Sequence, residues 1–195
     1  VPKSVAISRS ALTSSALATA SRIGEGAWLL ALPATYIAGI QVLVRSLVAG
    51  REPAVLAGTF SVGAFTAAAQ GLRSMEGGAL VPTYTALVPA QLERLLDDDA
   101  ARVALGSFEA VLIGGQALAV PLRERASEAG VRVVRTYGST ETSGGCVYDG
   151  LPLDGVSARV VAGELQLSGP MLADGYLGDP QRTAAVFERD AAGIR

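Results

Sequence analysis

Two kinds of hydrophobic pattern alternate along most of this chain: short uncharged runs, and longer stretches with apolar residues at helical spacing. The run over 28–32 is apolar throughout, which predicts a fully buried strand. Residues 36–48 place apolar side chains one helical turn apart, and Gly50 is expected to end that helix. The same patterns predict further strands over 54–56, 79–81, 109–113 and 131–135, and further helices from Ser8 or Ser10 to about Ile23 and over 62–72, 87–96 and 118–129.

The order of these elements predicts the fold class. Strands that alternate with helices of this length are typical of a layered α/β fold with a mostly parallel sheet and flanking helices. The pattern changes near the C-terminal end, where 156–161 and 164–167 alternate with period two around Gly163, so we expect a small antiparallel β element there. We expect an α/β part over 1–150 and a small, incomplete β-rich subdomain over 151–195.

Composition narrows the possible functions. Half of the 195 residues are hydrophobic, 17% are charged and the net charge is −2, so the basic excess of a nucleic-acid binder is missing and no nucleic-acid partner is expected. The chain has no histidine, which excludes Ser-His-Asp and Cys-His catalysis within it, as well as histidine-ligated zinc. Its single cysteine, Cys146, excludes an internal disulfide and is typical of a reducing, cytoplasmic location.

The stretch 27–44 carries no charge and is long enough to span a membrane. Pro33, Gly39 and Gln41 interrupt it, and Arg45 follows directly. We interpret it as a strand, a loop and a helix, and predict no membrane span.

The strongest chemical signal lies at 137–142, Tyr-Gly-Ser-Thr-Glu-Thr, directly after a predicted strand. Tyr137 offers an aromatic face for a base, and Gly138 allows a close approach of the backbone and a positive φ. The hydroxyls that follow can donate to a phosphate, and Glu141 can hold Mg²⁺, which prefers oxygen ligands. A polar turn after a buried strand explains these residues equally well.

A second signal follows the neighbouring predicted strand, where Gly114, Gly115 and Gln116 come after 109–113. Ligands of open α/β sheets bind beyond the carboxyl ends of the strands. If the two strands are neighbours, both loops line one crevice and the glycine pair can lie flat against a planar ring. A tight turn into a helix accounts for the glycines equally well, but the coincidence of two loops favours a nucleotide site.

These residues carry a resemblance to a known superfamily. The stretch 137–142 resembles the Tyr-Gly-x-Thr-Glu motif of the acyl-adenylate-forming enzymes, which include acyl- and aryl-CoA synthetases and peptide-synthetase adenylation domains. Val1-Pro2-Lys3 resembles the end of their phosphate-binding loop. Further segments resemble those of the superfamily in the same order, namely Leu32-Pro33 with Gly39, Gly163-Glu164-Leu165, Ser168-Gly169-Pro170, Gly175-Tyr176 and Thr183. Within the superfamily, 28–34, 37–46 and 141–150 are most similar to the o-succinylbenzoate–CoA ligases of menaquinone biosynthesis, in their actinobacterial form.

The resemblance implies an AMP-forming acid–thiol ligase that uses ATP, Mg²⁺ and CoA. A carboxylate, expected to be o-succinylbenzoate, would attack the α-phosphate of ATP, and the CoA thiol would then displace AMP. By similarity, the catalytic residues are Thr140, Glu141 and Lys3, with Glu141 also holding the metal. The nucleotide-binding residues implied are Gly114, Gly115, Gln116, Tyr137, Gly138, Ser139 and Thr140. The acyl-site residues implied are Tyr36, Ser143, Gly144 and Gly145.

Several departures from the family limit this interpretation. Most of the phosphate loop, the ribose-binding Asp and the mobile C-terminal domain with its catalytic Lys are missing, so we expect a large-domain part of a longer enzyme, inactive when isolated. Tyr36 stands where the family commonly has a histidine that shapes the acyl site, although an aromatic residue packing at a helix start is an equal alternative. Arg45 and Arg73 can pair with a dicarboxylate, but we expect both to be solvated on a helix surface.

Two other functions stay open from the sequence. One is another acyl- or aryl-CoA synthetase, or an adenylation domain that loads a carrier protein. The other is a non-catalytic α/β nucleotide-binding module. The expected partners are small molecules, a carboxylic acid with ATP and CoA, and a homo-oligomer is left open.

Overall fold

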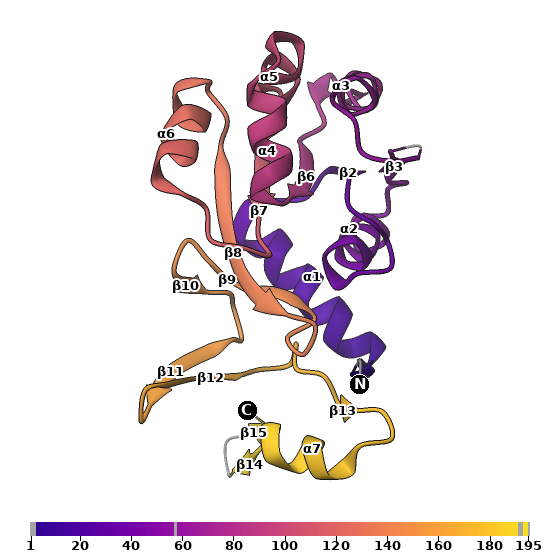
Figure 1. Cartoon of the computed structure of the whole chain (residues 1–195). Helices are drawn as coiled ribbons and strands as arrows, with labels where there is room; N and C mark the ends of the chain where they lie inside the picture. The colour runs from indigo at the N-terminus through magenta and orange to yellow at the C-terminus, as the bar shows by residue number, and fades with distance from the viewer. Residues whose placement is uncertain (1–2, 57, 191–192, 195) are drawn as a thin grey trace.

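A seven-stranded sheet forms the centre of the molecule (Figure 1), in a computed structural model that describes residues 3–56, 58–190 and 193–194. The strand order is β10-β9-β8-β7-β6-β2-β3. The five strands from β8 to β3 run parallel, and β9 and β10 continue the sheet antiparallel at one edge, which confirms the mostly parallel α/β fold. The bounds are β2 (Ala27–Leu30), β3 (Ala54–Val55), β6 (Thr83–Leu87), β7 (Ala110–Ile113), β8 (Val133–Ser139), β9 (Gly144–Tyr148) and β10 (Leu151–Pro152).

Helices cover both faces of this sheet (Figure 1). Four helices, α3 to α6, pack on one face, and α1 and α2 pack on the other. Successive residues of a strand point to opposite faces, so Leu29 joins the first core and Trp28 the second. The helices are α1 (Arg9–Ile23), α2 (Ile37–Val48), α3 (Val62–Gly71), α4 (Pro89–Leu96), α5 (Asp99–Gly106), α6 (Val120–Glu128) and α7 (Pro180–Val186).

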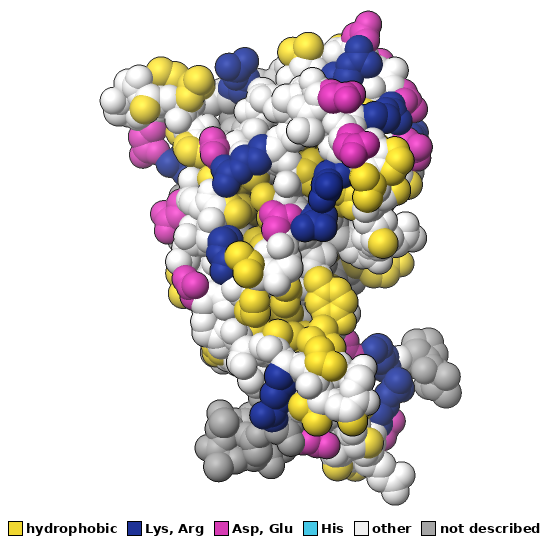
Figure 2. All heavy atoms as spheres, turned by 90° about the vertical axis from the view of Figure 1, so that its left-hand side faces the viewer, with side chains coloured by type: hydrophobic (Ala, Val, Ile, Leu, Met, Phe, Trp, Pro, Cys, Tyr) yellow, Lys and Arg dark blue, Asp and Glu magenta, His cyan; other side chains and the backbone are white. Residues whose placement is uncertain are grey.

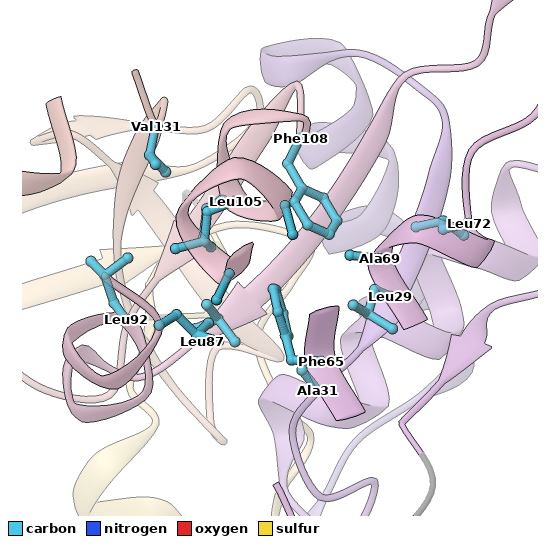
Figure 3. Close-up of a cluster of buried hydrophobic side chains, with 14 of the residues drawn as sticks. Leu29, Ala31, Phe65, Ala69, Leu72, Leu87, Leu92, Leu105, Phe108 and Val131 are labelled. Atoms are coloured by element: carbon cyan, nitrogen blue, oxygen red, sulfur yellow. The ribbon is translucent and has the colours of Figure 1, made fainter. Parts of the chain in front are cut away.

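The core under α3 to α6 is built around Phe65, which is fully buried (Figure 3). Its ring lies with its centroid 5.8 Å from that of Phe108. Leucines from the strands and from the helices α4 and α5 surround these rings, among them Leu29, Leu92 and Leu105. Burial of such side chains is the main favourable contribution to folding.

The opposite core rests on an aromatic pair. Trp28 of β2 and Tyr84 of β6 stack with ring centroids 5.1 Å apart. The Tyr84 hydroxyl donates to the carbonyl oxygen of Ile23 at 2.9 Å, which ties the end of α1 to the sheet. A buried tyrosine hydroxyl needs such a partner to offset its lost hydration.

Within the described residues, four two-stranded sheets lie outside the central one. The hairpin of β11 (Ser157–Val161) and β12 (Glu164–Ser168) confirms the antiparallel element expected near the C-terminal end. β1 (Val5–Ala6) pairs antiparallel with β13 (Gly175–Tyr176), which brings the first described residues beside residue 176. The remaining pairs are β4 (Met75–Glu76) with β5 (Ala79–Leu80) and β14 (Arg189–Asp190) with β15 (Gly193–Ile194).

The structure differs from the sequence prediction in three elements. The strand expected over 79–81 is only an arm of the exposed β4–β5 hairpin, and the sheet strand is β6, directly after Pro82. No helix was predicted directly after 87–96, yet the exposed Asp98 caps a further helix, α5, by accepting from the backbone N–H of Ala101 at 2.9 Å. β8 continues as a strand through Tyr137 to Ser139, where a loop was expected.

The uncharged stretch 27–44 folds as β2, a turn and the first part of α2, as predicted. No helix within the described residues is both long and apolar enough to cross a membrane. On one face of the molecule, basic and acidic side chains are interspersed around hydrophobic ones (Figure 2).

Candidate functional site

The two loops expected to form a site do lie together. β7 and β8 are parallel neighbours with Ile113 opposite Arg135, so their carboxyl ends open at the same edge of the sheet. A Cβ atom added at Gly114 would lie 2.4 Å from the Thr136 hydroxyl oxygen, which only a glycine at that position avoids. The loop after β7 is therefore pressed against β8 where the ligand crevice of an α/β sheet is expected.

Gly138 is required by a second close approach. β8 turns back into β9, and a bulge falls between Tyr137 and Gly138. A Cβ atom on Gly138 would lie 2.0 Å from the carbonyl oxygen of Gly144. The expected need for close backbone approach is met, whereas Gly138 is not among the residues with positive φ.

A cavity of about 500 Å³ lies between α2 and the ends of four sheet strands; we call it the inner cavity. Its walls are mostly apolar, and Tyr36, Gly144 and Gly145 of the predicted acyl site line it. The polar side chains that line it are Gln41, Arg45, Gln91, Thr136 and Tyr148. A concave, largely apolar cavity with a few fixed polar groups is typical of a small-molecule site.

Arg45 is buried at one wall of the inner cavity, with 6% of its surface exposed. Its Nη2 donates to the Tyr148 hydroxyl at 3.1 Å, and that hydroxyl lies 2.9 Å from the Thr19 hydroxyl. The guanidinium also lies 5.0 Å from the Trp28 ring centroid. Its Nε has no hydrogen-bond partner in the described part of the chain. The expectation that Arg45 is solvated was wrong, while Arg73 is exposed as expected.

Arg45 is buried because segments that are distant in the sequence pack around it. Helical spacing puts Arg45 on the same face of α2 as Gln41, one turn earlier, and Gln41 is buried too. That spacing was the available sequence signal. The Gln41 amide nitrogen donates to the Leu12 carbonyl oxygen at 3.3 Å, and its Oε1 has no partner among the described residues.

A second cavity, which we call the outer cavity, has a volume of about 790 Å³. It lies between the loop 115–118, the end of β8 and the β11–β12 hairpin, which contributes Ala158 and Leu165. Tyr137 lines it with 57% of its surface exposed, and Gln116 faces it from the other loop. The inner and outer cavities share three lining residues, Gly115, Thr136 and Gly138.

The turn between β8 and β9 carries the remaining predicted residues. The backbone N–H of Ser139 donates to the Thr142 hydroxyl at 2.8 Å, and the Ser143 N–H donates to the Thr140 carbonyl at 3.1 Å. The Ser143 hydroxyl donates to the Met171 carbonyl at 2.7 Å and is fully buried. Ser143 therefore lies beside the acyl region but lines neither cavity, and its hydroxyl is engaged in holding the turn.

Glu141 joins two residues from the far ends of the described chain. Lys3 forms an ion pair with Glu141 Oε1, and the Tyr176 hydroxyl donates to the same oxygen at 2.7 Å. Val1 and Pro2, the other residues of the expected phosphate-loop end, lie outside the described residues. The structure thus brings together Lys3 and Glu141, both predicted from the sequence, with Tyr176, which the prediction missed.

The local electrostatics keep Glu141 ionised. Partial burial acts to raise its pKa, but hydrogen bonds from Lys3, Tyr176, its own backbone N–H and Ser139 outweigh burial and lower the pKa to about 2. Burial and the Glu141 carboxylate raise the pKa of Tyr176, so its hydroxyl stays protonated and donates at neutral pH. The carboxylate is fixed in place and negatively charged.

A family model described as AMP-binding enzyme matches residues 1–177, so the chain belongs to the AMP-binding enzyme family. Similar members of that family include 2-succinylbenzoate–CoA ligases. A probable 2-succinylbenzoate–CoA ligase of Mycobacterium tuberculosis (strain CDC 1551 / Oshkosh) is 45% identical over 200 residues, which cover 98% of this chain and 51% of the relative. The chain thus spans about half the length of that relative.

Solved structures agree with this fold. Wild-type Escherichia coli MenE with a bound m phenylether-linked analogue of OSB-AMS matches with a TM-score of 0.77 at 28% identity, over 99% of this chain and 42% of that one. Bacillus subtilis o-succinylbenzoate coenzyme A synthetase in complex with ATP and magnesium ion matches with a TM-score of 0.82 at 23% identity, over 99% of this chain and 46% of that one. The second likeness concerns the fold alone.

Proposed function

We propose that this chain forms the nucleotide- and acyl-binding part of an o-succinylbenzoate–CoA ligase acting in menaquinone biosynthesis. One observation carries the proposal: a mostly apolar cavity with a buried arginine adjoins a second cavity lined by Tyr137 and Gly115. The shared residues Gly115, Thr136 and Gly138 mark the place where an acid and a nucleotide would meet. The names of the relatives support the choice of acid.

ATP would bind through the outer cavity. Tyr137 would cover one side of the adenine ring, and Gly115 and Gln116 would form the opposite wall, next to Gly114 on the inner-cavity side. Thr140 and Lys3 would donate to the phosphates, for which a hydroxyl and an ammonium are suited. Gly138 and Ser139 would keep the backbone close to the nucleotide.

The acid would occupy the inner cavity. o-Succinylbenzoate carries two carboxylates, of which one reacts, and Arg45 would bind the other through its unpartnered Nε. A buried, unpartnered guanidinium N–H is costly, so an anion or water there is favoured. Gly144 and Gly145 leave room for the aromatic ring, and Tyr36, 69% exposed, would stand at the mouth of the cavity.

The first step needs positioning more than acid–base chemistry. A substrate carboxylate is already ionised at neutral pH, because its pKa lies near 4. Its oxygen would form a bond to the α-phosphorus while the bond to pyrophosphate breaks, giving the acyl-AMP and pyrophosphate. The chain would hold the two reactants at the junction of the cavities and neutralise charge with Lys3. The absence of histidine from the sequence is compatible with this step.

Mg²⁺ fits the residues present. It usually binds proteins through one or two carboxylates together with substrate phosphates. Among the described residues, no group of three or more His, Cys, Asp or Glu side chains could form a metal cage, and Glu141 supplies one fixed carboxylate. When bound, Mg²⁺ would neutralise phosphate charge, and Glu141 would hold it beside Thr140.

In the second step, the CoA sulfur would attack the acyl carbon, its thiol proton would be lost to solvent and AMP would leave.

We assign 1–150 to nucleotide and acyl binding and 151–195 to a smaller β-rich part, as the sequence predicts. A cytoplasmic location stays a prediction based on the single, buried Cys146.

The test is ATP–pyrophosphate exchange by the full-length protein with different acids. We expect exchange with o-succinylbenzoate and little with benzoate or fatty acids. Arg45→Met should raise the KM for o-succinylbenzoate about 10- to 100-fold, the value expected for a lost hydrogen bond to a charged group. Arg73→Met, at an exposed position, is the matched control.

Exchange with fatty acids alone would support another acyl-CoA synthetase instead. Binding of ATP without exchange on any acid would favour a non-catalytic nucleotide-binding module. An Arg45→Met protein with unchanged KM would remove Arg45 from the acyl site, provided that its melting temperature matches the wild type.

A further inference from the structure

We propose that Tyr176 is a positioning residue that holds the Glu141 carboxylate in the orientation needed for Mg²⁺ and the nucleotide phosphates. This inference rests on the proposed function, because it takes Glu141 as the metal-binding carboxylate. Tyr176 itself contacts neither cavity that we assign to the acid or to adenine.

The contact between the two residues is direct. The Tyr176 hydroxyl donates to Glu141 Oε1 at 2.7 Å, although the residues lie 35 positions apart in the sequence. The side chain of Glu141 is only 13% exposed, so few waters can replace that donor. Hydrogen bonds to an ionised acceptor are the stronger class of hydrogen bond.

Tyr176 is itself held firmly from several sides. It is buried and lies in β13, where it pairs with Val5 of β1. Its backbone N–H donates to the Thr183 hydroxyl at 2.9 Å, and its ring packs edge-on against Phe187 with centroids 5.7 Å apart. The Arg182 guanidinium covers the ring at 4.8 Å from the centroid. A hydroxyl on so constrained a ring can fix a partner's direction.

The turn that carries Glu141 is held by the same C-terminal segment. The Ala173 backbone N–H donates to the Glu141 carbonyl at 2.8 Å, and the Met171 carbonyl accepts from the Ser143 hydroxyl. Backbone and side chain of Glu141 are therefore fixed by residues 171–176 together. A shift of this segment would displace the carboxylate.

The chemical type of the donor explains why a tyrosine suits this position. Glu141 Oε1 also accepts from Lys3, which is partly exposed on a flexible side chain and can turn toward a bound phosphate. The Tyr176 hydroxyl would remain when Lys3 leaves. Because the hydroxyl is neutral, it does not repel a cation held by the same carboxylate.

The test compares two tyrosine-to-phenylalanine variants of the full-length protein. Tyr176→Phe removes the hydroxyl and keeps the ring that Arg182 and Phe187 contact. Tyr84→Phe is the control, because it removes a buried hydroxyl that bonds to the Ile23 carbonyl in the core, away from Glu141. Calorimetry measures ATP binding with and without Mg²⁺, and exchange assays give the Mg²⁺ concentration for half-maximal rate.

We expect Tyr176→Phe to raise the half-maximal Mg²⁺ concentration about tenfold, the effect of losing one hydrogen bond to a charged group. Metal-free ATP binding and the KM for the acid should stay unchanged, and Tyr84→Phe should not alter the metal dependence. In a Glu141→Gln background, adding Tyr176→Phe should produce no further change, because the two residues act as a unit.

An unchanged Mg²⁺ dependence in Tyr176→Phe, or an equal effect of the variant with and without Glu141→Gln, would overturn the proposal. Failure of the proposed function looks different. In that case the wild-type protein itself shows no exchange with o-succinylbenzoate, while the calorimetric comparison of ATP with and without Mg²⁺ still tests Tyr176.

Discussion

At the scale of single residues, two charged side chains are held in place by direct contacts with their neighbours. Arg45 is surrounded by Trp28, Tyr148 and the inner cavity, and Glu141 contacts Lys3 and Tyr176. Removing one partner of such a group leaves the other without compensation, which is why these positions should respond strongly to substitution.

The lowered pKa of Glu141 predicts a pH dependence of stability in metal-free buffer. A carboxyl whose pKa is lower in the folded state stabilises the fold above its unfolded-state pKa, and this contribution disappears as the pH falls from about 5 to about 2. Lys3 is partly exposed, so we expect only about 1–2 kcal/mol from this source. Denaturant unfolding across this pH range measures it. Glu141→Gln should flatten the curve, and a curve as steep as that of the control Glu124→Gln would contradict the assignment.

The sequence predicted those site residues whose type alone limits what they can do. Gly138 was expected to permit a close approach of the backbone, and it does, whereas the expected packing of Gly114 against a planar ring stays a prediction. Arg45 could not be placed, because its burial depends on Trp28 and Tyr148, which lie far away in the sequence. Tyr176 belonged to a recognised motif, but its contact with Glu141 depends on tertiary packing.

At the scale of elements, the pair β8–β9 makes the site. It places Tyr137 on the outer cavity and Gly144 and Gly145 on the inner one, with the Glu141 turn between them. A strand pair that lines both cavities and carries the Glu141 turn should tolerate little change in its closest backbone contact.

Gly138→Ala tests that contact. The added methyl group would collide with the Gly144 carbonyl, so the strands must separate, and we expect a loss of about 1–3 kcal/mol in the free energy of unfolding. Chemical denaturation measures it. Gly63→Ala in α3, where nothing lies within 4 Å of the new atom, should be neutral or slightly stabilising. Equal stability of the two variants would show that β8 and β9 separate without cost.

Most elements were predictable, and two of the missed ones, β6 and α5, share a physical reason. β6 was missed because Thr83 and Thr85 looked polar, yet the Thr85 hydroxyl is satisfied inside the sheet by the Leu29 carbonyl at 3.0 Å. α5 was missed because the exposed Asp98 lies in a run of acidic residues just after the predicted helix 87–96, yet its side chain caps a second helix. In both cases the polar side chain forms a hydrogen bond that stabilises the element, and the sequence alone does not predict that bond.

At the scale of the whole molecule, the sheet separates two cores that differ in composition. The α3–α6 side is built from aliphatic side chains around Phe65 and Phe108, and the α1–α2 side from Trp28, Tyr84 and Tyr148. The inner cavity opens on the second side, next to Arg45 and Tyr148. Stability should therefore depend chiefly on the first core.

Phe65→Ala tests this division. Phe65 is fully buried, and its removal leaves a cavity, so we expect a loss of about 3–5 kcal/mol in the free energy of unfolding. Val103→Ala, at a position that is 78% exposed, should change stability by less than about 0.5 kcal/mol. Thermal and denaturant unfolding measure both. A loss in Phe65→Ala as small as in the control would contradict a core centred on this ring.

The pairing of β1 with β13 has a consequence for how such enzymes can diversify. Lys3 and Tyr176 meet at Glu141 although most of the described chain separates them. A single crossover between the codons of these two residues would combine Lys3 of one parent protein with Tyr176 of the other. A single crossover thus separates the parental Lys3 and Tyr176, whereas an exchange confined to a segment between them, such as α2, keeps both from one parent.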